Sequence, residues 1–164
     1  MIADSGARRQ FSTGAVRDIT DGKGRCDLLP LGTIGAMLSD IILCMINAYI
    51  RTGERDYLRE ALNSFVQIAF ENWETALLEL SIHYEEGIAK YGERNWEKGI
   101  PLHCFIDSAV RHYLKWKRGD TDERHDRAVL WNLIGALWTQ INHADKPELI
   151  DLPFAKEEAK HESN

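Results

Sequence analysis

The chain has 164 residues, of which 44% are hydrophobic and 28% charged, which suits one globular domain with a sizeable core. It contains 20 Lys and Arg residues and 26 Asp and Glu residues, which gives a net charge of −6. This balance argues against a partner that is a nucleic-acid polymer, because such binders normally present a basic face.

Residues 1–30 are rich in Gly, Asp and Arg and show no helical period, so we expect an irregular loop segment there. Apolar residues at spacings of three and four then predict one amphipathic helix over 32–51. A second apolar pattern covers 56–91. A single helix of that length is uncommon, so we expect a break near 71–74.

A loop between two glycines is predicted after Gly92, followed by helices over 105–117 and about 123–142. No segment shows strict alternation, so we expect an all-α protein, a helical bundle of about four to five helices. The single domain should cover 1–145, and the polar residues 146–164 should form a loosely ordered tail.

The three cysteines form an odd set without CxxC spacing, which argues against a disulfide framework and for a reducing compartment. The N-terminus lacks the apolar stretch of a signal peptide. The apolar run over 28–50 contains an aspartate and an asparagine, which a membrane span tolerates poorly. We therefore expect a cytoplasmic protein without a membrane partner.

Three groups of residues could carry chemistry. On the helix around 77–91, Glu85 lies beside an apolar stripe that includes Leu77, Leu80 and Ile88, whereas Glu86 lies in a more polar row. A carboxylate among apolar residues is costly unless it is paired, hydrogen-bonded or metal-bound. A solvated helix with local Glu–Lys pairs is about as compatible with this composition.

The second group is Asp107, Arg111 and His112. The spacing of four suits an ion pair between the first two, and this structural interpretation is favoured over a metal site. In the third group, Asp122 and His125 stand three apart at a helix start, so both can reach one point. A carboxylate with an imidazole suits Mn²⁺ or Zn²⁺, and N-capping by Asp122 is the alternative.

Asn132 stands seven residues after His125 and so shares its face, where a buried amide needs partners. Cations and aromatic residues gather in the loops, where glycines let a backbone approach phosphate and Arg offers two donors. These loop residues are Lys23, Arg25, Lys90, Tyr91, Arg94, Asn95 and Trp96. Anchoring of Trp96 to the core and solvation of the lysines are equally compatible with the pattern.

Four segments resemble motifs of the phage dATP/dGTP diphosphohydrolase family, which is related in broad plan to all-α MazG-type and dimeric dUTPase-type enzymes. Residues 22–30 (GKGRCDLLP) are similar to its GK.R.DLLP motif, and 90–99 (KYGERNWEKG) to KYG..NW..G. Residues 108–112 (SAVRH) resemble its S-A-x-R-H helix. Residues 120–125 (DTDERH), followed by 131–132 (WN), resemble its acidic turn, His and Asn.

The resemblance implies a helical homo-oligomer that uses Mg²⁺ or Mn²⁺ to hydrolyse dATP or dGTP to the monophosphate and pyrophosphate. It implies metal ligation by Glu85, Asp122 and His125, with catalytic roles for Glu85, Glu86 and His112. The residues that it implies for substrate binding are Lys23, Arg25, Asp27, Lys90, Tyr91, Arg94, Asn95, Trp96, Arg111 and Asn132.

The chain departs from the family pattern in two ways. Residues 31–76 resemble a helical insertion, and the spacing of the MazG-type ExxE and ExxD pairs is absent. A phage protein that binds and sequesters nucleotides without turnover is therefore the alternative function. An HD-type phosphohydrolase, with His112, His125, Asp126 and Asp145, and a purely structural helical module rank lower.

Overall fold

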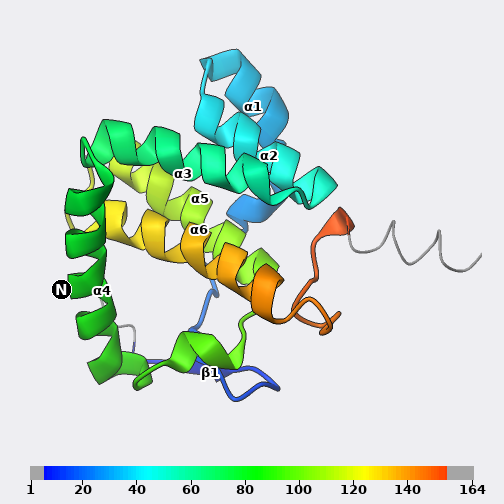
Figure 1. The fold of residues 1–164 in the computed structure, drawn as a ribbon, viewed down its shortest axis with the longest axis vertical. Helices are drawn as coiled ribbons and strands as arrows, with labels where there is room; N and C mark the ends of the chain where they lie inside the picture. Colours follow the sequence, from blue (N-terminus) through cyan, green and yellow to red (C-terminus); the bar gives the residue numbers. More distant parts are fainter. Residues whose placement is uncertain (1–5, 155–164) are drawn as a thin grey trace, which may run out of the picture.

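The structure, a computed structural model, describes residues 6–154, and these residues are mostly helical (Figure 1). Its α-helices are α1 (Leu31–Leu38), α2 (Ile41–Thr52), α3 (Arg55–Ala69), α4 (Trp73–Tyr91), α5 (Leu102–Arg118) and α6 (His125–Asn142). Two short 3₁₀ helices, η1 (Cys26–Leu28) and η2 (Asn95–Lys98), and two strands, β1 (Arg8–Gln10) and β2 (Val16–Asp18), complete the described part. The predicted helical class is confirmed, with more helices than expected.

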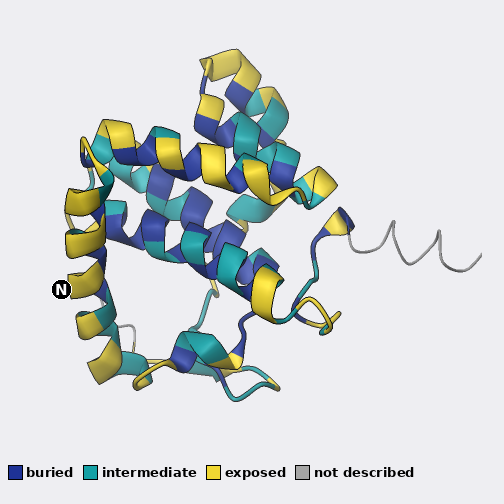
Figure 2. Cartoon of the chain, in the orientation of Figure 1, coloured by how far each residue is buried: buried dark blue, intermediate teal, exposed yellow. Residues whose placement is uncertain are grey.

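Helices α5 and α6 pack against each other at the centre of the molecule, and α3 and α4 both contact α6 (Figure 1). The facing sides of α5 and α6 are buried (Figure 2). Gly135 permits the close approach, since a Cβ atom there would overlap the ring of Phe105. The exposed fraction of Phe105 and Leu133 is 0%, so the helix pair α5–α6 forms the core against which the other elements pack.

The single helix predicted over 32–51 is in fact two helices. Ser39 adopts a left-handed conformation (φ 52°), and the Asp40 side chain caps α2 by accepting from the Leu43 amide at 3.2 Å. The buried Asp40 carboxylate also accepts from Tyr113 Oη at 2.9 Å and Lys117 Nζ at 2.6 Å. The α1–α2 hairpin is therefore anchored to α5 through one charged side chain.

The predicted break near 71–74 is confirmed, since α3 ends at Ala69 and the Asn72 side chain caps α4 by accepting from the Thr75 amide at 2.8 Å. The predicted apolar stripe of α4 is only partly right, because Leu80 is buried as expected but the buried side is rotated away from Leu77 and Ile88. Leu77 and Ile88 are 52% and 50% exposed, whereas His83 is buried. Figure 2 shows the outer side of this helix as largely exposed.

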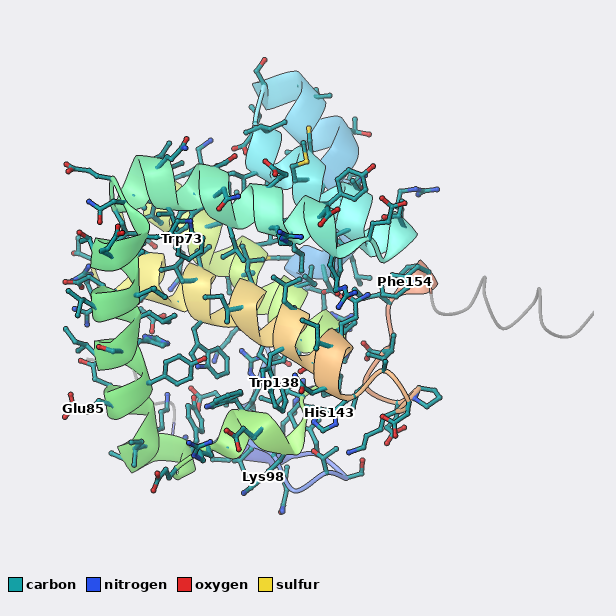
Figure 3. All side chains as sticks on the ribbon, viewed as in Figure 1. Trp73, Glu85, Lys98, Trp138, His143 and Phe154 are labelled. Atoms are coloured by element: carbon teal, nitrogen blue, oxygen red, sulfur yellow. The ribbon has the colours of Figure 1, made fainter. Side chains whose placement is uncertain are left out.

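The termini also differ from expectation. Instead of an irregular loop throughout 1–30, β1 and β2 form an antiparallel pair in which Arg9 faces Arg17. Beyond α6, Leu149 and Phe154 are buried and Phe154 packs against Gly53 (Figure 3), so the chain is packed up to that point rather than loose from 146. The predicted tail over 155–164 lies outside the described residues. Within 6–154, no helix is both long and apolar enough to span a bilayer.

Candidate functional site

A cavity of about 640 Å³ lies between the β1–β2 hairpin, the C-terminal half of α4, the turn that follows it, and the helices α5 and α6. Its lining combines three kinds of side chain. Aromatic rings come from Tyr84, Tyr91, Trp96 and Trp131. Cationic groups come from Arg9, Arg17, Lys23, Arg94, Arg111 and Lys115, and metal-ligating groups from His112, Asp122 and Glu123.

Arg17 on β2 is held at the wall of this cavity. Its Nη2 donates to Asn132 Oδ1 at 2.8 Å and to Ser108 Oγ at 3.1 Å, and its guanidinium lies 5.2 Å from the centre of the Phe105 ring. Nη1 is buried, and among residues 6–154 it has no hydrogen-bond partner. Burial lowers the pKa of Arg17. A buried donor without an acceptor is costly, so a ligand with an oxygen acceptor would stabilise it.

His112 on α5 meets His125 at the start of α6, with Nδ1 atoms 2.9 Å apart. Glu123 Oε1 lies 3.5 Å from Nδ1 of His112 and 3.6 Å from Nδ1 of His125. Metal–ligand bonds of about 2.1 Å at angles of 90–110° place ligand atoms about 3.0–3.5 Å apart. Burial lowers the pKa of His112 well below its usual value, so its lone pair is available near neutral pH. This triangle fits a divalent cation.

Asp122 lies on the far side of the same histidine. Its Oδ1 is 2.8 Å from His125 Nε2, and its Oδ2 accepts from Lys115 Nζ at 3.0 Å. These two hydrogen bonds, with His125 first, lower the pKa of Asp122 to about 2. The structure thus brings Asp122 and His125 together as the spacing predicted. A carboxylate on the other ring nitrogen orients a ligating histidine, and Asp120, Asp122 and His125 form a second possible group.

Several residues expected to bind substrate line the cavity and are not fully used in contacts with other protein groups. They are Lys23, Tyr91, Arg94, Trp96 and Arg111. Arg111 pairs with the buried Asp107 and donates to the Gly24 carbonyl at 3.1 Å. Asp107 also accepts from the Cys26 amide at 2.7 Å. The structural interpretation of the Asp107–Arg111 spacing is therefore confirmed.

Three residues expected to bind substrate are used elsewhere. Arg25 and Asp27 form a two-contact ion pair at 2.7 and 2.5 Å and do not line the cavity. Lys90 Nζ donates to Asp18 Oδ2 at 2.6 Å, so its charge is partnered with β2. These cations hold the N-terminal segment rather than face the cavity.

The two asparagines expected to bind substrate line the cavity, but their amide groups are already engaged. Asn95 Oδ1 accepts from the Val16 amide, and its Nδ2 donates to the Val16 carbonyl, both at 2.8 Å. Asn132 accepts from Arg17 and donates from Nδ2 to the Ala128 carbonyl at 2.8 Å. Both residues therefore position the strand that carries Arg17.

Glu85 does not join the histidines in this chain. It is exposed and points away from the body of the molecule (Figure 3), and neither it nor Glu86 lines the cavity. The reason is the phase of α4, whose buried side carries Leu80, His83 and Tyr84. Burial lowers the pKa of His83 to about 4, so this cavity-lining imidazole is neutral at pH 7.

A family model described as dATP/dGTP diphosphohydrolase, N-terminal, matches residues 67–148, which is half of the chain. The protein belongs to this family. The matched range contains α4, α5 and α6, and with them all three members of the histidine–glutamate triangle. No curated protein and no solved structure matches the chain significantly.

Proposed function

We propose that the protein hydrolyses dATP or dGTP to the deoxynucleoside monophosphate and pyrophosphate in a reaction that depends on a divalent metal ion. Membership of the diphosphohydrolase family supports a hydrolase. The observation that carries the proposal is one cavity lined by Arg17, by aromatic rings and by His112 and Glu123, which form a triangle with the adjoining His125. Nη1 of Arg17 is buried and has no hydrogen-bond partner among residues 6–154. A nucleoside triphosphate needs these three elements: anion donors, a metal and a surface for the base.

The cationic residues give the phosphates their binding site. Arg17 offers Nη1, and Arg111 and Lys115 line the cavity together with His112, so their charges offset those of the phosphates near the triangle. The cavity lining also includes Trp96, which is fixed by edge contacts with Trp138 and Tyr84 at ring separations of 4.9 and 5.8 Å. A rigid ring of this kind suits stacking on a purine.

The triangle of His112, Glu123 and His125 favours Mn²⁺ over Mg²⁺. Two imidazoles with one carboxylate are softer ligands than the all-oxygen set that Mg²⁺ prefers. When bound, the ion would supply charge neutralisation and a water of lowered pKa. Asp122 would keep the proton on Nε2 of His125 and direct Nδ1 towards the triangle. Lys115 holds Asp122 in place for this role.

Purified protein is incubated with each dNTP and NTP, with Mg²⁺ or Mn²⁺, and the products are separated by ion-exchange chromatography. Monophosphate with pyrophosphate from dATP or dGTP, abolished by EDTA and by H125Q, supports the proposal. D122N should lower this activity, and D56N is its matched control, since Asp56 is 81% exposed and pairs with Arg59. Diphosphate or triphosphate as product would contradict it. Unchanged nucleotide that co-elutes with the protein would favour a sequestering protein.

We also propose that the functional unit is a homo-oligomer in which α4 faces a second copy of the chain. The outer side of α4 exposes Leu77, Leu78, Ile82 and Ile88 by 38–70%, and a contiguous exposed apolar surface usually marks an interface. Light scattering after size exclusion tests this. The wild type should exceed the monomer mass, and L78K should return it to one chain, whereas a monomeric wild type would refute the proposal.

A further inference from the structure

Cys104 lies on the first turn of α5 next to two basic side chains. Its Sγ is 3.2 Å from Nε2 of His103, and Nη2 of Arg9 on β1 contacts the same sulfur. Cys104 is only 3% exposed at the protein surface, but it lines the large cavity together with Arg9 and Arg17. The thiol is therefore surrounded by protein and reached from the cavity.

A carboxylate fixes the charge on the histidine. Asp151, from the segment after α6, pairs with Nδ1 of His103, and its Oδ1 accepts from the His103 backbone amide at 3.0 Å. The hydrogen bond to Asp151, followed by that to Cys104, raises the pKa of His103 to about 10. The imidazole is consequently a cation at neutral pH, with Nε2–H directed at the sulfur.

The other charged groups near the sulfur are arginines. Arg9 belongs to β1 and Arg17 to β2, and each has one buried guanidinium nitrogen without a hydrogen-bond partner among the described residues, Nε in Arg9 and Nη1 in Arg17. A cysteine at a helix N-terminus, beside Arg and protonated His, has the surroundings in which thiolates are stabilised and react. An oxygen bound to the sulfur would offer these donors a new acceptor.

The other two cysteines have different surroundings. Cys26 contacts Arg111, but it also lies near the carboxylates of Asp107 and Asp27, and burial is the main cause that raises the pKa of its thiol. Cys44 on α2 faces the backbone of Gly35 in the α1–α2 hairpin. The chain therefore contains two internal controls for the reactivity of Cys104.

We propose that Cys104 is a modification site that reacts with hydrogen peroxide. The thiolate of Cys104 attacks one peroxide oxygen, so an S–O bond forms as the O–O bond breaks. The departing hydroxide takes the proton from Nε2 of His103 and leaves as water. Sulfur loses two electrons, the peroxide gains them, and the product is the sulfenic acid of Cys104. His103 acts here as the acid that protonates the leaving group, and Asp151 positions it.

The test treats the folded protein with hydrogen peroxide for increasing times. Each sample is then unfolded in denaturant that contains iodoacetamide, and peptide mapping counts the thiols left at Cys26, Cys44 and Cys104. Alkylation after unfolding removes any effect of access on the count. We expect Cys104 to lose its thiol at least about tenfold faster than the other two. Equal rates, or a slower loss at Cys104, would overturn the proposal.

Two variants from different elements separate the chemistry from a folding defect. H103Q removes the acid on α5 and R9Q removes the cation on β1, and each should slow the loss at Cys104 several-fold while leaving Cys26 and Cys44 unchanged. R59Q, on the exposed side of α3, is the matched control and should have no effect. A wild-type rate at Cys104 in both H103Q and R9Q, with circular dichroism showing native helices, would also overturn the proposal.

Discussion

Replacing Arg17 by methionine should abolish tight nucleotide binding while leaving the fold nearly as stable. The variant keeps the length of the side chain but removes the charge. Two hydrogen bonds, to Asn132 and Ser108, are lost, and each acceptor left unpaired costs about 1–3 kcal/mol. Against this, the variant no longer buries a guanidinium with Nη1 unpaired, whose desolvation penalty is several kcal/mol. The free energy of unfolding should therefore change by less than about 2 kcal/mol.

The effect on binding has no such compensation. A phosphate oxygen that accepts from Nη1 forms a charge-assisted hydrogen bond worth about 1.5–3 kcal/mol. Its loss corresponds to a dissociation constant raised about 10- to 150-fold. Calorimetric titration with a dATP analogue that carries a methylene group between the α and β phosphorus atoms measures this without turnover. Urea unfolding measures the stability of the same preparations.

R59M is the matched control, because the Arg59 side chain is 69% exposed and remote from the cavity. It should bind the analogue as the wild type does. Wild-type affinity of R17M for the analogue would refute this role of Arg17, since Nη1 would then have no ligand partner. A loss of more than about 4 kcal/mol in the free energy of unfolding of R17M would also refute this role, because the arginine would then be a structural residue.

Three further predictions concern the other charged sites. H112Q and H125Q should each abolish Mn²⁺ binding, measured by electron paramagnetic resonance, and D122N should weaken it by about 10- to 100-fold. Wild-type Mn²⁺ affinity in all three variants would show that the triangle is not a metal site. E85Q should bind Mn²⁺ as the wild type does, because Glu85 points away from the cavity. A lower Mn²⁺ affinity of E85Q would indicate that Glu85 is a metal ligand. D40N should lower the free energy of unfolding at pH 7 by about 1–3 kcal/mol, since the Lys117 and Tyr113 donors lose their charged acceptor. Burial alone would raise the pKa of Asp40, but hydrogen bonds from Lys117, Leu43 and Tyr113 outweigh it and lower that pKa. The contribution of Asp40 is therefore complete above the unfolded pKa near 4 and is lost as the pH falls through the lower folded value, so the difference between D40N and wild type in urea should shrink in acid.

The helices could be predicted wherever one apolar period identifies one helix. The break between α3 and α4 was predictable from length alone, because one helix would have been unusually long. The break at Ser39–Asp40 was not, since the apolar spacing continues across it and only the left-handed Ser39 and the capping Asp40 interrupt the backbone. The three-residue strands are too short for alternation to show.

The site was predictable where helical spacing determines it, as for Asp122 and His125. Glu123 was missed because residues two apart lie on different sides of a helix. The structure begins α6 at His125, so Glu123 belongs to the preceding turn and its carboxylate can reach both histidines. Glu85 was misplaced because many positions of α4 are apolar, so its buried side is set by contacts with α6 rather than by sequence period.

Three of the motif residues contact β2 and so hold this strand in position. Lys90 and Asn95, from the KYG..NW segment, bind Asp18 and Val16, the two neighbours of Arg17 along the strand. Asn132 then receives the guanidinium itself. The family match covers these three anchors but not the strand that they hold. Part of the motif therefore acts by delivering Arg17 to the cavity, and N95A should weaken ligand binding through a misplaced arginine, without any contact between Asn95 and the ligand.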